Sequence, residues 1–167
     1  MLKLRFYLLF IVVILVNHSA YSSDFISKDN LIGKGRMDYF FWHVYDVNLY
    51  AEDTFSFNKP FALSLEYRLN LNGVEIAEKS IAEIKKIGFD DKEKLEQWRE
   101  EMRKIFPNVT DSDILTGIYN PNKPTKFLKN NQEIGVVEDP EFGKWFFGIW
   151  LSEKTSQPRL RKVLLGG

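Results

Sequence analysis

Residues 142–166 read FGKWFFGIWLSEKTSQPRLRKVLLG, and they say more about the fold than any other stretch of the chain. Large apolar side chains recur there at the spacing i, i+3, i+4, i+7 and i+8, at Phe142, Trp145, Phe146, Ile149 and Trp150. This spacing predicts a helix with one broad aromatic face. Just before it, Asp139 and Pro140 supply an N-cap and a first-turn proline. A helix with so much apolar area must cover either a sheet or a cavity in front of a sheet.

The composition is that of one folded domain. The chain has 167 residues, of which 44% are hydrophobic and 15% aromatic, and phenylalanine alone occurs 14 times. A chain of this length can bury a real core but is short for two domains. We see no internal repeat and no linker rich in proline or glycine, so residues 23–167 are expected to form a single domain with a large apolar interior.

The first 22 residues have the pattern of a secretory signal peptide. Lys3 and Arg5 form a basic start, residues 6–16 are an unbroken run of eleven apolar residues, and Ala20 and Ser22 suit a signal peptidase. The alternative is a membrane anchor, but eleven helical residues span only about 16 Å, half of the hydrocarbon core. We therefore expect residues 1–22 to be removed and the mature protein to be periplasmic or secreted.

Charge and cysteine content exclude several kinds of partner. Without residues 1–22 the chain keeps 21 basic and 23 acidic residues, with no basic stripe that would suit nucleic acid or an anionic membrane surface. No cysteine occurs, which rules out an N-terminal lipid anchor, disulfides and thiol chemistry. We expect no nucleic-acid partner and no stable membrane anchor after signal cleavage, while a protein partner stays open.

Strand patterns fill much of the remaining chain. Alternating apolar residues predict one long aromatic strand over residues 34–50, a half-buried strand over residues 61–71 and a strand over residues 114–119. Asn130 and Asn131 tolerate positive φ and predict the turn of a further hairpin.

Two amphipathic helices are predicted between the second and third of these strands. The first ends at Gly88 as a C-cap, and the second begins with the capping pattern of Asp90 and Glu93 and stops at Pro107. A short final helix opens at Pro158. Its expected inward residues are Leu160, Val163 and Leu164. Because strands and helices occur in groups, we predict an α+β fold: an antiparallel sheet with helices collected on one face.

Few residues of the mature chain suit catalysis or metal binding. His43 is the single histidine once His18 leaves with the signal peptide, so neither a zinc site nor a Ser-His-Asp triad has support. Neighbouring acidic residues lie in turn or helix-surface contexts, where solvated charge is the simpler explanation. No phosphate-binding glycine motif occurs. We expect no metal and no cofactor.

One pair of side chains remains as a possible binding site. Arg36 opens the aromatic strand and Tyr45 lies nine residues further on. Arginine offers a bidentate fork for a carboxylate, and a tyrosine hydroxyl can add a third hydrogen bond. An odd separation puts the two on opposite faces of an unbroken strand, so a bulge or bend would be needed to bring them together. The alternative is that Arg36 is an ordinary surface cation.

Four segments resemble the chalcone isomerase family. They are GKGRMDYFFWHVYDVNLYAED over residues 33–53, DILTGIYNP over residues 113–121, NNQEIG over residues 130–135 and the tail DPEFGKWFFGIWLSEKTSQPRLRKVLLG over residues 139–166. The resemblance spans residues 31–166, nearly the whole mature chain. It implies an open-faced sandwich, in which a large antiparallel sheet carries a layer of helices, with a ligand cleft between them.

The resemblance also implies where a ligand would bind. In the plant enzyme an arginine near the strand start holds the oxyanion and a threonine in a K-F-T stretch assists, whereas this chain has His43-Val44-Tyr45 there. Tyrosine at that place is the pattern of the non-catalytic, fatty-acid-binding branch. The resemblance therefore implies Arg36 and Tyr45 as the head-group pair and Tyr119 as a looser candidate. The aromatic face of the tail would be core, with some members lining an acyl cavity.

Two functions of different kinds follow as expectations. The first is a secreted, non-enzymatic binder of a small amphipathic carboxylate such as a fatty acid. The alternative is an isomerase or lyase acting on an α,β-unsaturated carbonyl compound, with Arg36 as oxyanion stabiliser. In a third reading side chains fill the cleft, and the domain works through a protein partner.

Overall fold

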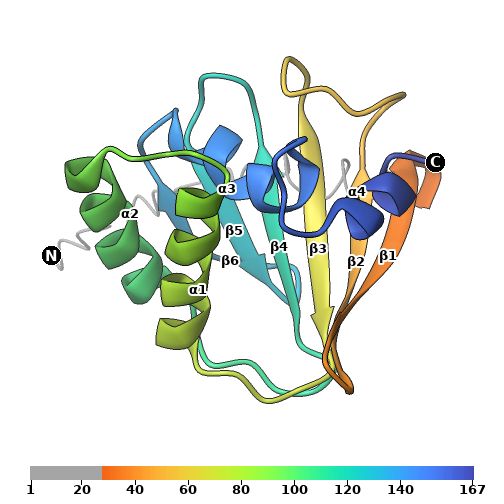
Figure 1. Cartoon of the computed structure of the whole chain (residues 1–167), viewed down its shortest axis with the longest axis horizontal. Helices are drawn as coiled ribbons and strands as arrows, with labels where there is room; N and C mark the ends of the chain where they lie inside the picture. Colours follow the sequence, from red (N-terminus) through yellow and green to blue (C-terminus); the bar gives the residue numbers. More distant parts are fainter. Residues whose placement is uncertain (1–27) are drawn as a thin grey trace, which may run out of the picture.

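The computed structural model describes residues 28–167, which form a sheet layer and a helix layer (Figure 1). The predicted signal peptide lies outside the described residues. A single turn of 3₁₀ helix, Lys28–Asn30, leads into the first strand.

The sheet has six antiparallel strands that follow one another in chain order from edge to edge. The strands are β1 Leu31–Tyr39, β2 Trp42–Tyr50, β3 Phe61–Tyr67, β4 Ile114–Tyr119, β5 Thr125–Lys129 and β6 Gln132–Val137. Each strand pairs only with its neighbours in sequence, and consecutive strands commonly lie side by side in this way. The strand predicted over residues 114–119 is confirmed, and so is the hairpin turn at Asn130 and Asn131, which both have positive φ.

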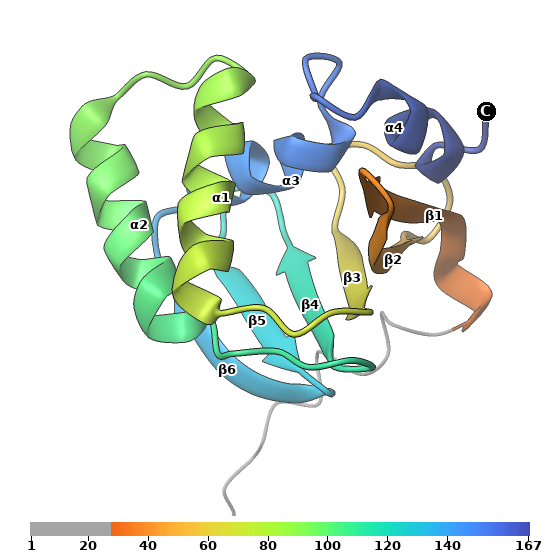
Figure 2. The same cartoon turned by 60° about the horizontal axis from the view of Figure 1, so that its bottom comes forward.

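The α-helices of the described residues lie on one face of this sheet (Figure 2). Helices α1 Gly73–Lys86 and α2 Lys92–Ile105 connect β3 to β4, and α3 Phe142–Leu151 and α4 Pro158–Leu164 follow β6. The predicted α+β fold, an antiparallel sheet with a helical layer on one face, is confirmed. In the part of the chain that the structure describes, none of the helices is both long and apolar enough to cross a membrane.

The single long strand predicted over residues 34–50 is wrong. The chain forms two strands there, β1 and β2, which fold back on each other around Phe40 and Phe41. The turn escaped prediction because it contains no glycine, asparagine or proline, the residues that mark hairpin turns. Instead Phe40 itself adopts a positive φ of 53°.

The helix ends agree with the predictions apart from small shifts. Gly88 has a positive φ after α1, as a C-cap requires, but the N-cap of α2 is Asp91 rather than Asp90. The prediction of Asp139 as N-cap and Pro140 as first-turn proline of the aromatic helix is wrong, because α3 begins at Phe142 with Glu141 as its N-cap. Asp139 instead accepts a hydrogen bond from the backbone N–H of Glu141 (2.9 Å), just before the helix. In α4 the side chains of Leu160 and Leu164 are buried as predicted. The inward position predicted for Val163 is wrong, because its side chain is 51% exposed.

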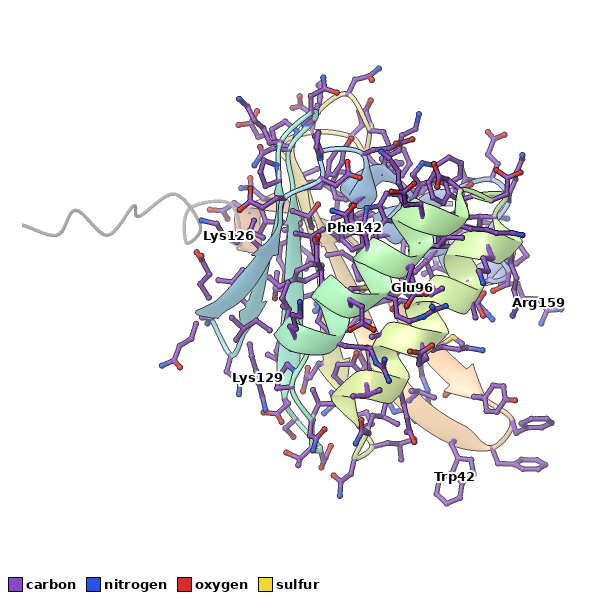
Figure 3. The ribbon with its side chains drawn as sticks, turned by 90° about the vertical axis from the view of Figure 1, so that its left-hand side faces the viewer. Trp42, Glu96, Lys126, Lys129, Phe142 and Arg159 are labelled. Carbon is purple, nitrogen blue, oxygen red and sulfur yellow. The ribbon has the colours of Figure 1, made fainter. Side chains whose placement is uncertain are left out.

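Helix α3 is buried between the sheet and the other helices. Phe142 and Phe147 are both fully buried, and Phe142 lies between the helices and the sheet in Figure 3. Phe146 is central to the aromatic packing. Its ring contacts those of Phe106, Phe127, Phe142, Phe147 and Trp150. The predicted aromatic face therefore covers the sheet, and burial extends beyond that face to Phe147 and Leu151.

Strand β3 is buried on both faces, whereas a half-buried strand ending near residue 71 was predicted. Ala62 and Ser64 face away from the helices and are buried as well. The hydroxyl groups of Ser64 and Thr116 hydrogen-bond to each other across β3 and β4 (2.8 Å). Because these outer-face side chains are small and the strand is central, little of their surface is exposed. The strand is therefore buried on both faces, although its alternating pattern predicted burial on one.

Replacing Asp113 with asparagine is expected to weaken the fold in a pH-dependent way. Its carboxylate accepts hydrogen bonds from Asn130 and Thr110 and pairs with Lys129, and these contacts hold its pKa well below the usual range. A depressed pKa stabilises the fold above the unfolded-state value and loses that effect as the pH falls. We expect Asp113→Asn to lower the free energy of unfolding by about 1–2 kcal/mol at neutral pH.

Urea unfolding of both proteins across pH measures this prediction. The difference between wild type and Asp113→Asn should shrink as the pH falls below about 4, where the unfolded-state carboxyl is protonated. A difference of the same size at every pH would contradict it.

Candidate functional site

A cavity of about 620 Å³ lies between the sheet and the helices. Its walls are mostly apolar, and the main apolar lining comes from the inward faces of β3, β4 and β5 and from α3. The main apolar lining residues are Leu63, Leu65, Leu115, Phe127, Phe146 and Ile149. This volume falls within the range of about 300–1,000 Å³ typical of small-molecule sites. The cleft is therefore not filled by side chains, as the third reading required.

Tyr45, on β2, points its hydroxyl group into this cavity region and receives a hydrogen bond there. The indole Nε1 of Trp150 donates to Tyr45 Oη at 2.9 Å, across 105 residues of sequence. Burial raises the pKa of Tyr45 to about 12, so the hydroxyl stays protonated at neutral pH. Because its oxygen accepts from Trp150, the O–H of Tyr45 remains able to donate to a bound molecule.

Tyr67 lies beside Tyr45 on the neighbouring strand β3. The two residues are cross-strand partners, and their rings meet edge to face with centroids 5.8 Å apart. Burial, and after it the neighbouring Tyr45, raises the pKa of Tyr67 well above its usual range. Sequence reasoning missed Tyr67 as a site residue. The sequence could have indicated it, because Tyr67 is the one hydroxyl-bearing residue among the β3 residues that face the helices.

A charged cluster on α1 lines another part of the cavity. Glu83 binds Lys86 (2.8 Å) and Lys79 (3.2 Å), and the hydroxyl of Ser156 donates to it (2.7 Å). Burial alone would raise the pKa of Glu83, but the hydrogen bonds from Lys86, Ser156 and Lys79 outweigh it and lower the pKa. Glu83 is thus ionised at neutral pH, and two ammonium groups stand beside it at the cavity. The sequence carried no motif for this cluster.

The structure does not bring Arg36 and Tyr45 together. Cross-strand partners share a face of the sheet, and β1 pairs Met37 with Tyr45 but Arg36 with Asp46. Met37 and Tyr45 line the cavity, whereas Arg36 lies on the other face, 58% exposed, with its Nε 2.7 Å from Asp38 Oδ1. An oxyanion stabilised by Arg36, as the isomerase alternative requires, would lie outside this cavity.

Tyr119 is buried but does not line the cavity. Its hydroxyl donates to the backbone carbonyl of Phe57 (3.1 Å), and its ring stacks on Phe61. Tyr119 therefore ties the connection between β2 and β3 to β4. The prediction that part of the aromatic face of the tail lines a cavity is confirmed. The lining members of that face are Phe146, Ile149 and Trp150.

His43 lies in a network of polar side chains on the outer face of the sheet. His43 Nε2 lies 2.9 Å from Asp46 Oδ1, and Arg68 also binds Asp46 (2.8 Å). Over residues 28–167, no group of three or more histidine, cysteine or acidic side chains is arranged to hold a metal ion.

A six-stranded antiparallel meander with a helical layer and a cavity between the two defines an open-faced sandwich. A family model described as chalcone isomerase-like matches residues 27–166. The chain therefore belongs to the chalcone isomerase-like family, as its sequence segments indicated.

Two further comparisons fit this family. The chain is 32% identical over 127 residues to an uncharacterized protein of Haemophilus influenzae, in a match covering 75% of this chain and 62% of that protein. A solved structure of a fatty-acid binding protein from Arabidopsis thaliana is similar with a TM-score of 0.62. That match covers 84% of this chain and 88% of the other at 12% identity, so it shows a shared fold.

Proposed function

We propose that this protein is a non-enzymatic binder of a small amphipathic molecule, with a fatty acid as the leading candidate. The observation that carries this proposal is the cavity of about 620 Å³, whose mostly apolar walls end at two protonated phenols, Tyr45 and Tyr67. The fatty-acid binding function of the Arabidopsis protein with a similar fold supports it.

The polar groups of the cavity suit the head of such a ligand. The O–H of Tyr45 donates a hydrogen bond to a carboxylate or carbonyl oxygen, and Lys79 and Lys86 supply positive charge along α1. A hydrogen bond to a charged group contributes about 1.5–3 kcal/mol. Arg36 has no part in this arrangement, which replaces the head-group pair expected from the sequence.

The apolar walls suit the tail and dominate the affinity. Each buried methylene contributes about 0.8 kcal/mol, so eight of them contribute about 6 kcal/mol, more than the head-group contact. The proposal therefore implies weak selection for the head and strong dependence on chain length.

Native mass spectrometry of the protein purified from its own cells tests the proposal directly. We expect a co-purifying acid, and a protein mass that lacks residues 1–22 if the proposed export to the periplasm or beyond is right. A protein that carries no small molecule and binds no fatty acid in calorimetry would refute the binding function, whatever its mass.

Tyr45→Phe and Arg36→Ala form a matched pair of variants. Tyr45→Phe removes one oxygen at the cavity, and we expect it to weaken fatty-acid binding about tenfold by calorimetry, the equivalent of one hydrogen bond to a charged group. Arg36→Ala removes a larger charged group from the other face and should leave the affinity unchanged. The opposite ranking would contradict this site and favour the pair inferred from family resemblance.

A further inference from the structure

Four consecutive aromatic residues form the free end of the β1–β2 hairpin. Tyr39 is 59%, Phe40 80%, Phe41 99% and Trp42 64% exposed. Figure 3 shows Trp42 extending from the end of this hairpin, away from the sheet and the helices. We call residues 39–42 the aromatic tip. Contiguous apolar surface of this kind on a folded domain marks an interaction site.

Folding does not account for the aromatic tip. Phe40 has a positive φ of 53°, a conformation that is costly for a large side chain and is normally taken by glycine or asparagine. The other two-residue hairpin of the same sheet uses Asn130 and Asn131 for this purpose. The chain thus has a turn with favourable residues at one hairpin and a strained aromatic turn at the other. Backbone strain retained at an exposed site points to a function of that site.

The aromatic tip is continuous with the cavity. Tyr39 and Trp42 line the cavity as well as the tip, together with Glu75 and Lys79 of α1. These lining residues are exposed, so they mark the mouth of the cavity. Whatever covers the tip therefore lies at the entrance through which a ligand passes.

On the outer face of the sheet and on α1, the cations near the tip pair with acidic side chains. On the outer face Arg36 pairs with Asp38, and Arg68 pairs with Asp46. On α1 the two lysines at the cavity pair with Glu83. This arrangement leaves no cluster of unpaired cations to attract an anionic surface, and it complements a surface without net charge.

We propose that the aromatic tip inserts into the interfacial region of a lipid bilayer with zwitterionic headgroups, and so places the mouth of the cavity against the lipid. Tyrosine and tryptophan favour this interface because each combines an apolar ring with a polar edge, and phenylalanine favours the acyl boundary below it. An apolar ligand then moves between membrane and cavity without crossing water. The docking itself does not depend on the proposed ligand; the transfer step does.

Vesicle binding by the protein as cells process it tests this inference. Phosphatidylcholine vesicles containing brominated lipid should bind the protein and quench Trp42 fluorescence, and the quenching should be lost in Trp42→Phe while sedimentation with vesicles persists. The variant Phe40→Gly/Phe41→Asn installs a favoured turn, so it should fold at least as stably as wild type. We expect its vesicle affinity to fall about tenfold or more.

Two controls distinguish insertion of the aromatic tip from general hydrophobic or electrostatic binding to vesicles. Val163→Ser removes an exposed apolar side chain on α4 and should leave vesicle binding unchanged. Adding phosphatidylglycerol or salt should also change the affinity little, because the charges at the tip are paired. All variants share one N-terminus, so any contribution of residues 1–27 cancels.

Each other outcome overturns the proposal. Insertion is refuted if the wild-type protein does not bind phosphatidylcholine vesicles. It is also refuted if the tip variant binds them as well as wild type does. A tip variant whose only change is lost self-association in sedimentation would identify a second copy of the chain as the occupant. If the tip variant differs from wild type only in its affinity for ligand in solution, the tip acts as a lid over the cavity. Tyr45→Phe should bind vesicles normally, so loss of ligand binding alone refutes the proposed function and leaves the docking intact.

Discussion

Gly33→Ala is expected to lower the free energy of unfolding by about 2–4 kcal/mol, because the backbone of α4 leaves no room for a methyl group. A Cβ at Gly33 would lie 1.9 Å from the carbonyl oxygen of Leu164. That atom belongs to the helix backbone and cannot rotate away, so α4 would have to lift from β1, on which it packs (Figure 1).

Urea unfolding of Gly33→Ala and of Lys34→Ala measures this effect. Lys34 is the next residue on β1 and is exposed, so Lys34→Ala should change the stability by less than about 0.5 kcal/mol. Equal stabilities of the two variants would show that α4 is not held as closely to β1 as the structure indicates.

Ser80→Trp is expected to weaken fatty-acid binding about a hundredfold or more, because it puts an indole into the space proposed for the tail. Ser80 lines the cavity from the middle of α1. Its hydroxyl bonds only to the carbonyl of Ile76 in the same helix (2.8 Å), so its loss leaves no other side chain without a partner. The cavity supplies the room for the indole, and the fold should survive.

Ser80→Ala is the matched control for this prediction. It removes the same hydroxyl and adds no volume, so its affinity for a fatty acid should equal that of wild type. Calorimetry with fatty acids of increasing chain length should show the largest loss in Ser80→Trp for the longest chains. Full affinity in a folded Ser80→Trp protein would place the ligand elsewhere and refute the cavity as the binding site.

Most of the fold followed from local patterns. Strand β4 and the turn at Asn130 and Asn131 were predicted correctly because alternation and positive φ are local properties. The aromatic helix was also predicted correctly, since a 3.6-residue period needs no tertiary information. The turn at Phe40 and Phe41 could not be predicted, because it uses residues that favour strands.

The candidate site was predictable only in part. Tyr45, singled out by its residue type and then by family resemblance, does line the cavity, whereas its expected partner Arg36 does not. Tyr67 and the Glu83 cluster went unnoticed. Lys79 and Lys86 are local to Glu83 on α1, but only the packing of distant elements puts the cluster at the cavity. Tyr45 meets Trp150 across 105 residues, and Glu83 meets Ser156 across 73.

The amino-acid sequence alone was enough to establish the family, the α+β architecture and the aromatic helix that covers the sheet. The spacing of apolar residues also indicated the apolar face of most elements, because that spacing depends on residues a few positions away. Only the tertiary structure decided which side chains meet at the cavity. Next to the hairpin at Phe40 and Phe41, the pairing of β1 with β2 shifts by one residue between Asp38 and Met37. Such a shift changes which residues share a face of the sheet, and without it Arg36 would lie opposite Tyr45. That register puts Met37 beside Tyr45 in the cavity and Arg36 on the outside.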